Sequence, residues 1–205
     1  SGVLHGVSNL TQLVAIRDIR NLWIIGVVTG AKRWTEVLVI GIYTYKQTGS
    51  PLIVALIAFL NTVPGALFGV LIGAIAERFQ KRTLLLLGYS FSLMVMVVLF
   101  YLALSDKLML WHLALGTFLS GSVGTMEYPI RRTLLGEISG LERASTALTF
   151  DVASGKITMF IGPLLGGVLM HNFGIYSFYL LAIGLLGFAL LFVSRLQLTP
   201  LTVQT

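Results

Sequence analysis

The sequence contains no cysteine, and charged residues make up only 11% of its 205 residues. The absence of cysteine excludes disulfide bonds, thiolate metal sites and a cysteine nucleophile. The scarcity of charge, together with 56% hydrophobic residues and a mean hydropathy of +0.91, excludes an ordinary soluble domain. We therefore expect an integral membrane protein in contact with the lipid bilayer.

Patterns that would indicate an enzyme or a nucleic-acid-binding protein are also missing. His5, His112 and His171 lie far apart, so neither a metal site nor a Ser/His pair is indicated. Residues 120–122 lack the glycine that a Gly-x-Ser-x-Gly elbow needs, and no Gly-rich loop ends in Gly-Lys-Ser/Thr. The net charge of +6 comes from basic residues between apolar runs, which membrane topology explains better than nucleic acid does. We expect no enzymatic activity, no cofactor and no metal.

Six apolar runs, separated by short polar or Gly/Pro-containing stretches, are long enough to cross a membrane. About 20 apolar residues span a hydrocarbon core of roughly 30 Å, and membrane-barrel strands would be shorter and alternating. The expected spans are 22–45, 52–76, 83–104, 108–126, 147–170 and 175–193. Together they predict an all-α, polytopic membrane protein with a six-helix bundle over 21–195. Residues 1–20 are expected to hold a short interfacial helix without a signal-peptide cleavage pattern, and Ser1 in place of Met suggests a processed or partial chain.

The lysines and arginines are distributed unevenly between the two sets of loops. One set contains Arg17, Arg20, Arg78, Lys81, Arg82, Arg131, Arg132, Arg143 and Arg195, and the other contains Lys46 and Lys107. Cytoplasmic loops of membrane proteins carry the excess of basic residues. Both termini are therefore predicted to be cytoplasmic.

The first span carries three charges near its middle: Lys32, Arg33 and Glu36. Arg33 lies about 16 Å beyond Leu22, close to the bilayer midplane, where snorkelling is difficult. Three such residues facing lipid would cost roughly 8 to 10 kcal/mol, more than the aliphatic residues of the span return. The charges must therefore face the bundle interior, where Glu36 can neutralise either cation, and pairing of Arg33 with Glu36 is preferred.

Glu127 near the end of the fourth span and Asp151 and Lys156 in the fifth add further ionisable groups. Asp151 and Lys156 are five residues apart and should face different neighbours. The whole set fits either a polar cavity that meets substrate or protons, which we favour, or buried ion pairs that only lock helix packing.

Small residues form stripes on the second and fifth spans. Asn61, Gly65, Gly69, Gly73 and Glu77 recur every four residues, and Asp151, Gly155, Gly162 and Gly166 align similarly beside Pro163 and Gly167. Such faces allow another backbone to approach closely. They occupy the second helix of each group of three, which suggests a 3+3 inverted repeat.

At this point the sequence resembles the major facilitator superfamily. Gly73, Glu77, Arg78, Lys81 and Arg82 resemble its Gly-x-x-x-Asp-Arg-x-x-Arg-Arg signature between helices 2 and 3, with Glu77 in place of the usual Asp. Glu127, Pro129 and Arg131, followed by Glu137, resemble the segment leaving helix 4 in the branch of enterobactin and macrolide exporters. Gly162, Pro163, Gly166 and Gly167 resemble the helix-5 motif associated with antiporters, although Thr158 replaces one glycine.

The resemblance covers residues 21–195 and implies one six-helix half of a twelve-helix fold. It implies that helices 1 and 4 line a central cavity, and that helices 2 and 5 face the second half. That half would be a missing segment, with 196–205 as the start of a cytoplasmic linker, or a second short chain. Arg33 stands where many members of this branch carry an acidic residue.

The favoured function is a secondary transporter in a bacterial inner membrane, exporting a small amphipathic molecule in exchange for protons. Lys32, Arg33, Glu36, Glu127, Asp151 and Lys156 are its expected cavity and coupling residues. A non-transporting assembly or receptor protein stays open as an alternative, and an intramembrane enzyme is less favoured.

Overall fold

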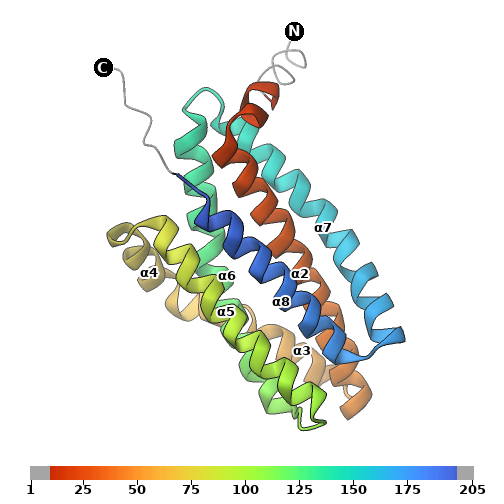
Figure 1. The fold of residues 1–205 in the computed structure, drawn as a ribbon. Coiled ribbons are helices and arrows are strands. Elements are labelled where there is room, and N and C mark those ends of the chain that lie inside the picture. The colour runs from red at the N-terminus through yellow and green to blue at the C-terminus, as the bar shows by residue number, and fades with distance from the viewer. Residues whose placement is uncertain (1–9, 198–205) are drawn as a thin grey trace.

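The computed structural model describes residues 10–197, which are helical without any strand in that range. The helices are α2 (Arg17–Thr48), α3 (Pro51–Leu60), α4 (Val63–Arg78), α5 (Lys81–Leu104), α6 (Leu110–Ser139), α7 (Ala144–Asn172) and α8 (Ile175–Ser194). They form a single elongated bundle (Figure 1). The predicted all-α architecture is confirmed. Residues 1–9 of the expected N-terminal segment and most of the expected linker, 196–205, lie outside the described residues.

The predicted spans overlap these helices, but the helices run further. The largest difference is α6, which continues to Ser139 although the fourth span was expected to end at residue 126. The prediction ended each span where charged residues begin. The backbone hydrogen bonds of a helix can nevertheless continue outside the hydrocarbon core. As a result, Arg131 and Arg132 belong to a helix and not to a loop, and Arg131 is buried.

The second predicted span is broken into α3 and α4 at Asn61 and Thr62. Pro64 has no N–H to donate to the carbonyl of Leu60, so the helical ladder is interrupted at this point. The amides of Asn61 and Thr62 instead donate to Ala58 and Phe59, three residues back. A break of this kind at membrane depth is tolerated where the backbone packs against protein or lines a cavity.

Four segments have the length and apolar composition of a membrane span: 51–78, 81–104, 144–172 and 175–194. The helices α2 and α6 do not meet this description, although they are 32 and 30 residues long. Polar composition and not length therefore sets them apart. The two helices that are too polar to face lipid on all sides are also the two that were expected to line a cavity.

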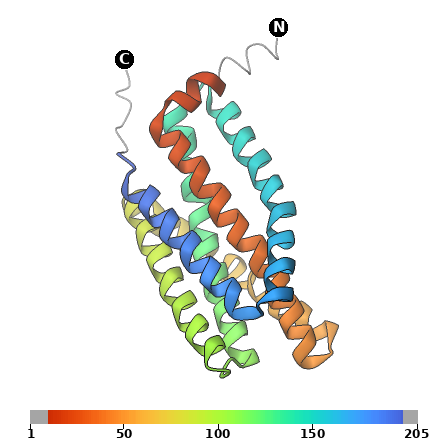
Figure 2. The same ribbon diagram turned by 45° about the vertical axis from the view of Figure 1, so that its right-hand side comes forward.

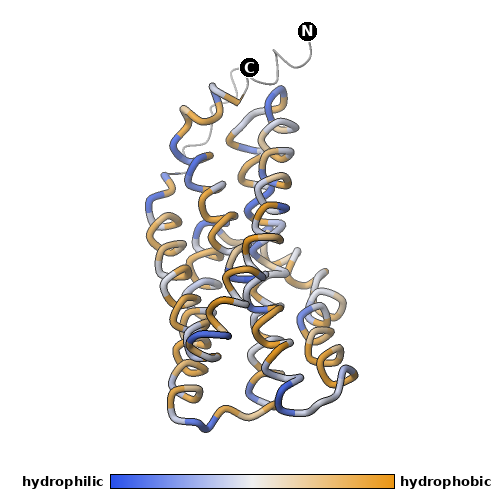
Figure 3. Tube along the Cα trace, turned by 90° about the vertical axis from the view of Figure 1, so that its right-hand side faces the viewer, coloured by the Kyte–Doolittle hydropathy of each residue, from blue (hydrophilic) through white to orange (hydrophobic). Residues whose placement is uncertain are grey.

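Helix α2 occupies the centre of the bundle, with α7 and α8 against it and α5 packed between α8 and α6 (Figure 2). Its buried residues Leu22 and Ile25 join Phe178 and Tyr179 of α8 in the core. Leu13 and Ile19 are also fully buried, so the segment expected to lie at the membrane interface packs onto the bundle instead. Hydrophobic residues extend along the helices, with hydrophilic ones at both ends and at a few points between (Figure 3).

The glycine stripes of the second and fifth spans differ in what packs against them. On α4, a Cβ added at Gly65 would lie 3.3 Å from the hydroxyl oxygen of Thr125 on α6, whereas one at Gly69 or Gly73 would meet nothing within 4 Å, so only the later part of this stripe lacks a partner among the described residues. On α7, a Cβ at Gly162 would lie 2.5 Å from the Cβ of Trp34, and one at Gly166 would lie 3.2 Å from the carbonyl of Thr35. The expectation that the fifth-span glycines face a second half is therefore wrong for Gly162 and Gly166, because α2 covers them.

Candidate functional site

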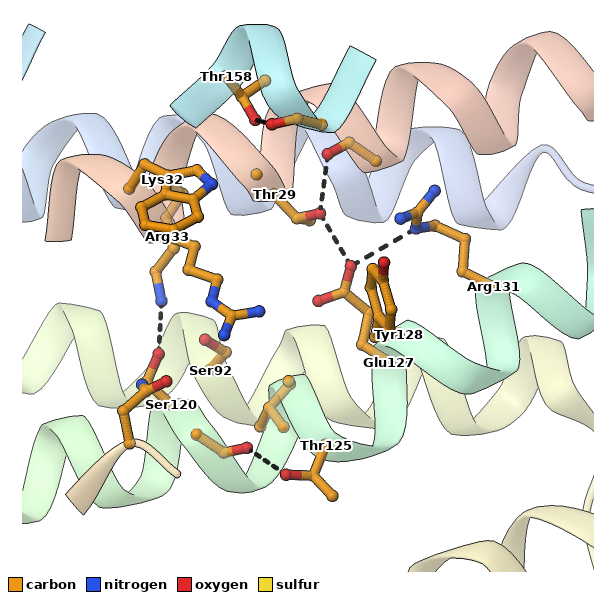
Figure 4. A pocket seen from close by; sticks show the side chains of 18 of the residues that line it. Thr29, Lys32, Arg33, Ser92, Ser120, Thr125, Glu127, Tyr128, Arg131 and Thr158 are labelled. Carbon is orange, nitrogen blue, oxygen red and sulfur yellow. Dashed lines mark hydrogen bonds and ion pairs between the residues drawn. The ribbon is translucent and has the colours of Figure 1, made fainter. Parts of the chain in front are cut away.

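A cavity of about 520 Å³ lies inside the bundle, between α2, α6 and α7, with contributions from α5, α8 and the break between α3 and α4 (Figure 4). Its lining includes four basic side chains, two carboxylates and several hydroxyl groups, together with aromatic and aliphatic residues. The ionisable lining residues are Lys32, Arg33, Glu127, Arg131, Asp151 and Lys156. Five of the six residues expected to line the cavity do so.

The sixth expected residue, Glu36, lies next to the cavity as the partner of Lys32. The Nζ of Lys32 is 2.7 Å from Oε2 of Glu36 and 2.8 Å from Oγ of Ser120 on α6. The Ser120 hydroxyl in turn donates to the same carboxylate oxygen at 3.0 Å. Since Lys32 and Glu36 are both buried, this triangle ties α2 to α6 with no net charge.

The expected pairing of Arg33 with Glu36 is wrong. Lys32, four residues from Glu36, takes the carboxylate, whereas Arg33 is exposed to the cavity and has no ion-pair partner among the described residues. On a helix, positions i and i+4 lie nearly one above the other, which allows Lys32 to be buried together with Glu36. Lys156 of α7 likewise lines the cavity without a carboxylate partner among residues 10–197.

A second charged cluster joins α2, α6 and α7 nearer one end of the cavity. Arg131 contacts the carboxylate of Asp151 through Nη1, and Arg132 Nε lies 3.9 Å from the other oxygen of Asp151. Arg131 Nε is also 3.9 Å from Glu127, whose Oε1 is 2.8 Å from the hydroxyl of Thr29 (Figure 4). Asp151 and Arg131 are both buried, so each cancels the charge of the other.

Two glycines on α2 make room for this arrangement. A Cβ at Gly26 would lie 2.4 Å from Nη1 of Arg131, and a Cβ at Gly30 would lie 2.7 Å from the hydroxyl oxygen of Thr158. Any side chain at Gly26 would push against the Arg131 guanidinium. The small residues of α2 thus let α6 and α7 approach closely enough to share charges across the bundle.

The residues of the other predicted motifs lie outside the cavity, with the exception of Pro129, which lines it, and Arg131. Lys81 at the start of α5 is 2.5 Å from Glu137 near the end of α6, so two separately predicted motifs meet. Arg82 donates to the carbonyls of Val193 and Ser194 at the end of α8. Gly73, Glu77 and Arg78 are exposed on α4, Gly167 is partly buried, and Pro163 lies inside α7.

The sequence analysis missed several polar residues of the cavity. Thr29, Ser92 and Ser120 contribute hydroxyl groups, and the buried phenol of Tyr89 faces Glu127. Thr29 could have been found, because it lies four residues before Arg33 on the same face of the helix. The serines could not, since small hydroxyl residues in membrane helices are usually packing residues.

Comparison with known proteins agrees with this geometry. Residues 22–203 match the family model described as Major Facilitator Superfamily. The chain belongs to this superfamily. It is also similar to the staphyloferrin A transporter of Staphylococcus aureus (strain NCTC 8325 / PS 47), with 28% identity over 116 residues. That match covers 56% of this chain and 29% of the relative, so the chain corresponds to only part of the relative's length.

Membership in the superfamily decides the class of protein. The chain is a multi-pass integral membrane protein of a transporter family and not an enzyme. The narrower resemblance, to the exporters of enterobactin and macrolides, stays a prediction.

Proposed function

We propose that the protein is a secondary transporter that exports a small amphipathic molecule by alternating access, driven by proton exchange. The observation that carries the proposal is the charged cavity in the middle of an otherwise apolar bundle. Charged groups inside membrane segments are costly to bury and usually mark the path of a substrate or an ion. A volume of about 520 Å³ suits a small molecule, since ligand pockets have volumes of roughly 300–1,000 Å³.

The lining of the cavity supports an amphipathic substrate. Basic and hydroxyl side chains from α2 and α6 share the surface with Trp34, Tyr128, Met159 and Leu186. A wholly polar ion would leave these apolar groups in contact with water, and a wholly apolar molecule would leave the charges without partners. A molecule with both kinds of surface satisfies both parts of the lining.

The three carboxylates near the cavity differ in how firmly they are held, and Glu127 is the proposed proton carrier. The side chains of Glu36 and Asp151 are 6% and 2% exposed and make close ion pairs, whereas Glu127 is 16% exposed and lies 3.9 Å from Arg131. Thr29, Tyr89 and Arg131 face Glu127 from α2, α5 and α6. Of the three, Glu127 can change its charge with the least disruption of packing.

The chain is proposed to form one half of the transporter, with both ends on the cytoplasmic side of a bacterial plasma membrane. The most apolar stretches of 51–78 and 144–172 have 11% and 22% of their residues buried, against 39% for the spans of α5 and α8. These less buried helices are the ones that face the other half in the superfamily fold. A second six-helix half, in the same polypeptide or in a second chain, would therefore cover α4 and part of α7 and complete the cavity.

The relative supports a transport role because its name describes a transporter of staphyloferrin A. A non-transporting assembly or receptor protein is the competing proposal. The test measures the flux of small amphipathic molecules into and out of sealed proteoliposomes that contain the purified full-length protein. A pH gradient is imposed and then dissipated with nigericin. Export that depends on the gradient supports the proposal. Saturable binding of a probe molecule without flux in either direction would contradict it and favour a receptor.

A further inference from the structure

In the part of the chain that the structure describes, the charges around the cavity do not balance, because each carboxylate near it already has a basic partner. Glu36 is bound by Lys32 and Ser120, and Asp151 by Arg131 and Arg132. Glu127 accepts the remaining contact of Arg131 and lies beside Thr29. Among residues 10–197, no carboxylate is left over for the other basic side chains of the cavity.

Those remaining side chains are Arg33 and Lys156. Neither makes an ion pair or a side-chain hydrogen bond with any residue between 10 and 197, and both are exposed where they line the cavity. A guanidinium carries five N–H donors and an ammonium three, so these two cavity-lining groups offer eight donors that no described side chain accepts. Unpaired cations in such a setting are unfavourable unless an anion joins them.

The two cations border the same helix contact. Gly30 of α2 packs against Thr158 of α7. Arg33 and Lys156 are three and two residues away from that contact on their own helices, within about one turn. Figure 4 shows the Arg33 guanidinium lying above Ser92, between the Lys32–Ser120 contact and Glu127. Arg33 from α2 and Lys156 from α7 thus both line the one cavity, in which every carboxylate among the described residues already has a basic partner.

We infer that Arg33 and Lys156 form a binding site for an oxyanion group of the transported molecule, such as a carboxylate. The inference rests on the proposed transport function and names the chemical class of its substrate: an amphipathic anion. The planar fork of Arg33 suits two oxygens of a carboxylate, and Lys156 adds a second point charge from the facing helix. The hydroxyl of Ser92, which also lines the cavity, offers a further donor.

Binding can be measured separately from transport with carboxyfluorescein as an anionic probe and rhodamine 6G as a cationic one. Fluorescence anisotropy of each dye with the purified full-length protein in detergent gives its affinity. We expect R33Q and K156Q each to weaken carboxyfluorescein binding about tenfold or more, because a charge-assisted hydrogen bond is lost. The matched control is K46Q, which removes an exposed cation from the far end of the same helix and should leave binding unchanged.

Two further variants distinguish the loss of the anion site from a general loss of folding, because they are expected to change binding without abolishing it. R33K keeps the charge but loses the planar fork, so it should bind more weakly than the wild type and more tightly than R33Q. The double variant R33E/K156E should favour rhodamine 6G over carboxyfluorescein. Higher salt should weaken carboxyfluorescein binding to the wild type more than to R33Q.

The outcomes separate this inference from the proposed function. The inference is wrong if the wild type does not bind carboxyfluorescein, if it prefers rhodamine 6G, or if R33Q and K156Q bind the anion as well as the wild type does. The last result would mean that carboxylates of a second half already neutralise both cations. Normal anion binding without flux in proteoliposomes would instead overturn the proposed transport function and leave the anion site standing.

Discussion

At the scale of single residues, helical spacing limited the partner of Glu36 to Lys32 or Arg33 but led to the wrong choice, and pairing between helices could not be predicted at all. The pairing of Lys32 with Glu36 follows from their spacing of four residues, and the structure selects it over Arg33 with Glu36. The contact of Arg131 with Asp151 joins two helices that are not related by any local pattern. Sequence reasoning therefore placed Arg131 in a loop, and its burial depends on tertiary packing that a single sequence does not reveal.

The Lys32–Glu36 pair predicts a specific stability difference. Glu36→Gln should lower the free energy of unfolding by about 3 kcal/mol, because it leaves the buried ammonium of Lys32 without its counter-charge. The double variant K32M/E36Q should be more stable than E36Q, since the uncompensated charge is gone. Thermal unfolding in detergent, followed by tryptophan fluorescence, measures both. Glu77→Gln, at an exposed carboxylate, is the control, and equal stability of E36Q and the wild type would refute the argument.

If Glu127 is the proton carrier, a variant that cannot be protonated at this position should lose proton coupling but still move substrate across the membrane. Glu127→Gln should abolish the response of transport to a pH gradient while downhill exchange of substrate continues, because the amide keeps the shape but cannot load a proton. Flux in proteoliposomes with and without the gradient measures this. Glu142→Gln, at an exposed position outside the cavity, should behave like the wild type. A full pH response in the Glu127 variant would remove this residue from the mechanism.

At the scale of helices, the existence of each span could be predicted, but its ends and internal breaks could not. Long apolar runs gave the correct helices because length and hydrophobicity suffice for that prediction. They placed the end of α6 too early, since charged residues can continue a helix beyond the hydrocarbon core. The break at Asn61 had a visible signal in Pro64, but a proline can also bend a helix without dividing it.

The close packing of α2 on α7 gives a prediction about the helix-5 glycines. Gly162→Ala should destabilise the protein by about 1–3 kcal/mol, because the new methyl group would lie 2.5 Å from the Cβ of Trp34 and 3.0 Å from the backbone of Thr35. Gly167→Ala is the matched control on the same helix, since its methyl group would make only an ordinary contact at 4.0 Å with Leu38. Thermal unfolding compares the two. Equal effects would mean that α2 and α7 are not in close contact.

At the scale of the whole molecule, counting basic residues predicted which loops lie on the same side of the membrane. The unequal distribution of charge remains when Arg131 and Arg132 are counted as part of α6 and not of a loop. Without Arg131 and Arg132, seven basic residues remain at one end of the bundle against Lys46 and Lys107 at the other. The amide of Gln197 lies 3.3 Å from Oδ1 of Asp18, so the start of α2 and the end of α8 lie together. An even number of crossings was thus predictable, whereas the shape of the cavity was not, because it depends on contacts among five helices.

The orientation of the bundle in the membrane is open to a direct labelling experiment, since the chain has no cysteine of its own. Gln80 lies between α4 and α5 at the end where Lys81 pairs with Glu137, and Lys107 lies in the opposite loop. In intact cells, a membrane-impermeant maleimide should label Lys107→Cys and not Gln80→Cys, because the excess of basic residues keeps the Gln80 end in the cytoplasm. Both variants should react after the cells are opened, which shows that each thiol is accessible. Labelling of Gln80→Cys in intact cells would contradict the predicted orientation and place both ends of the bundle outside the cytoplasm.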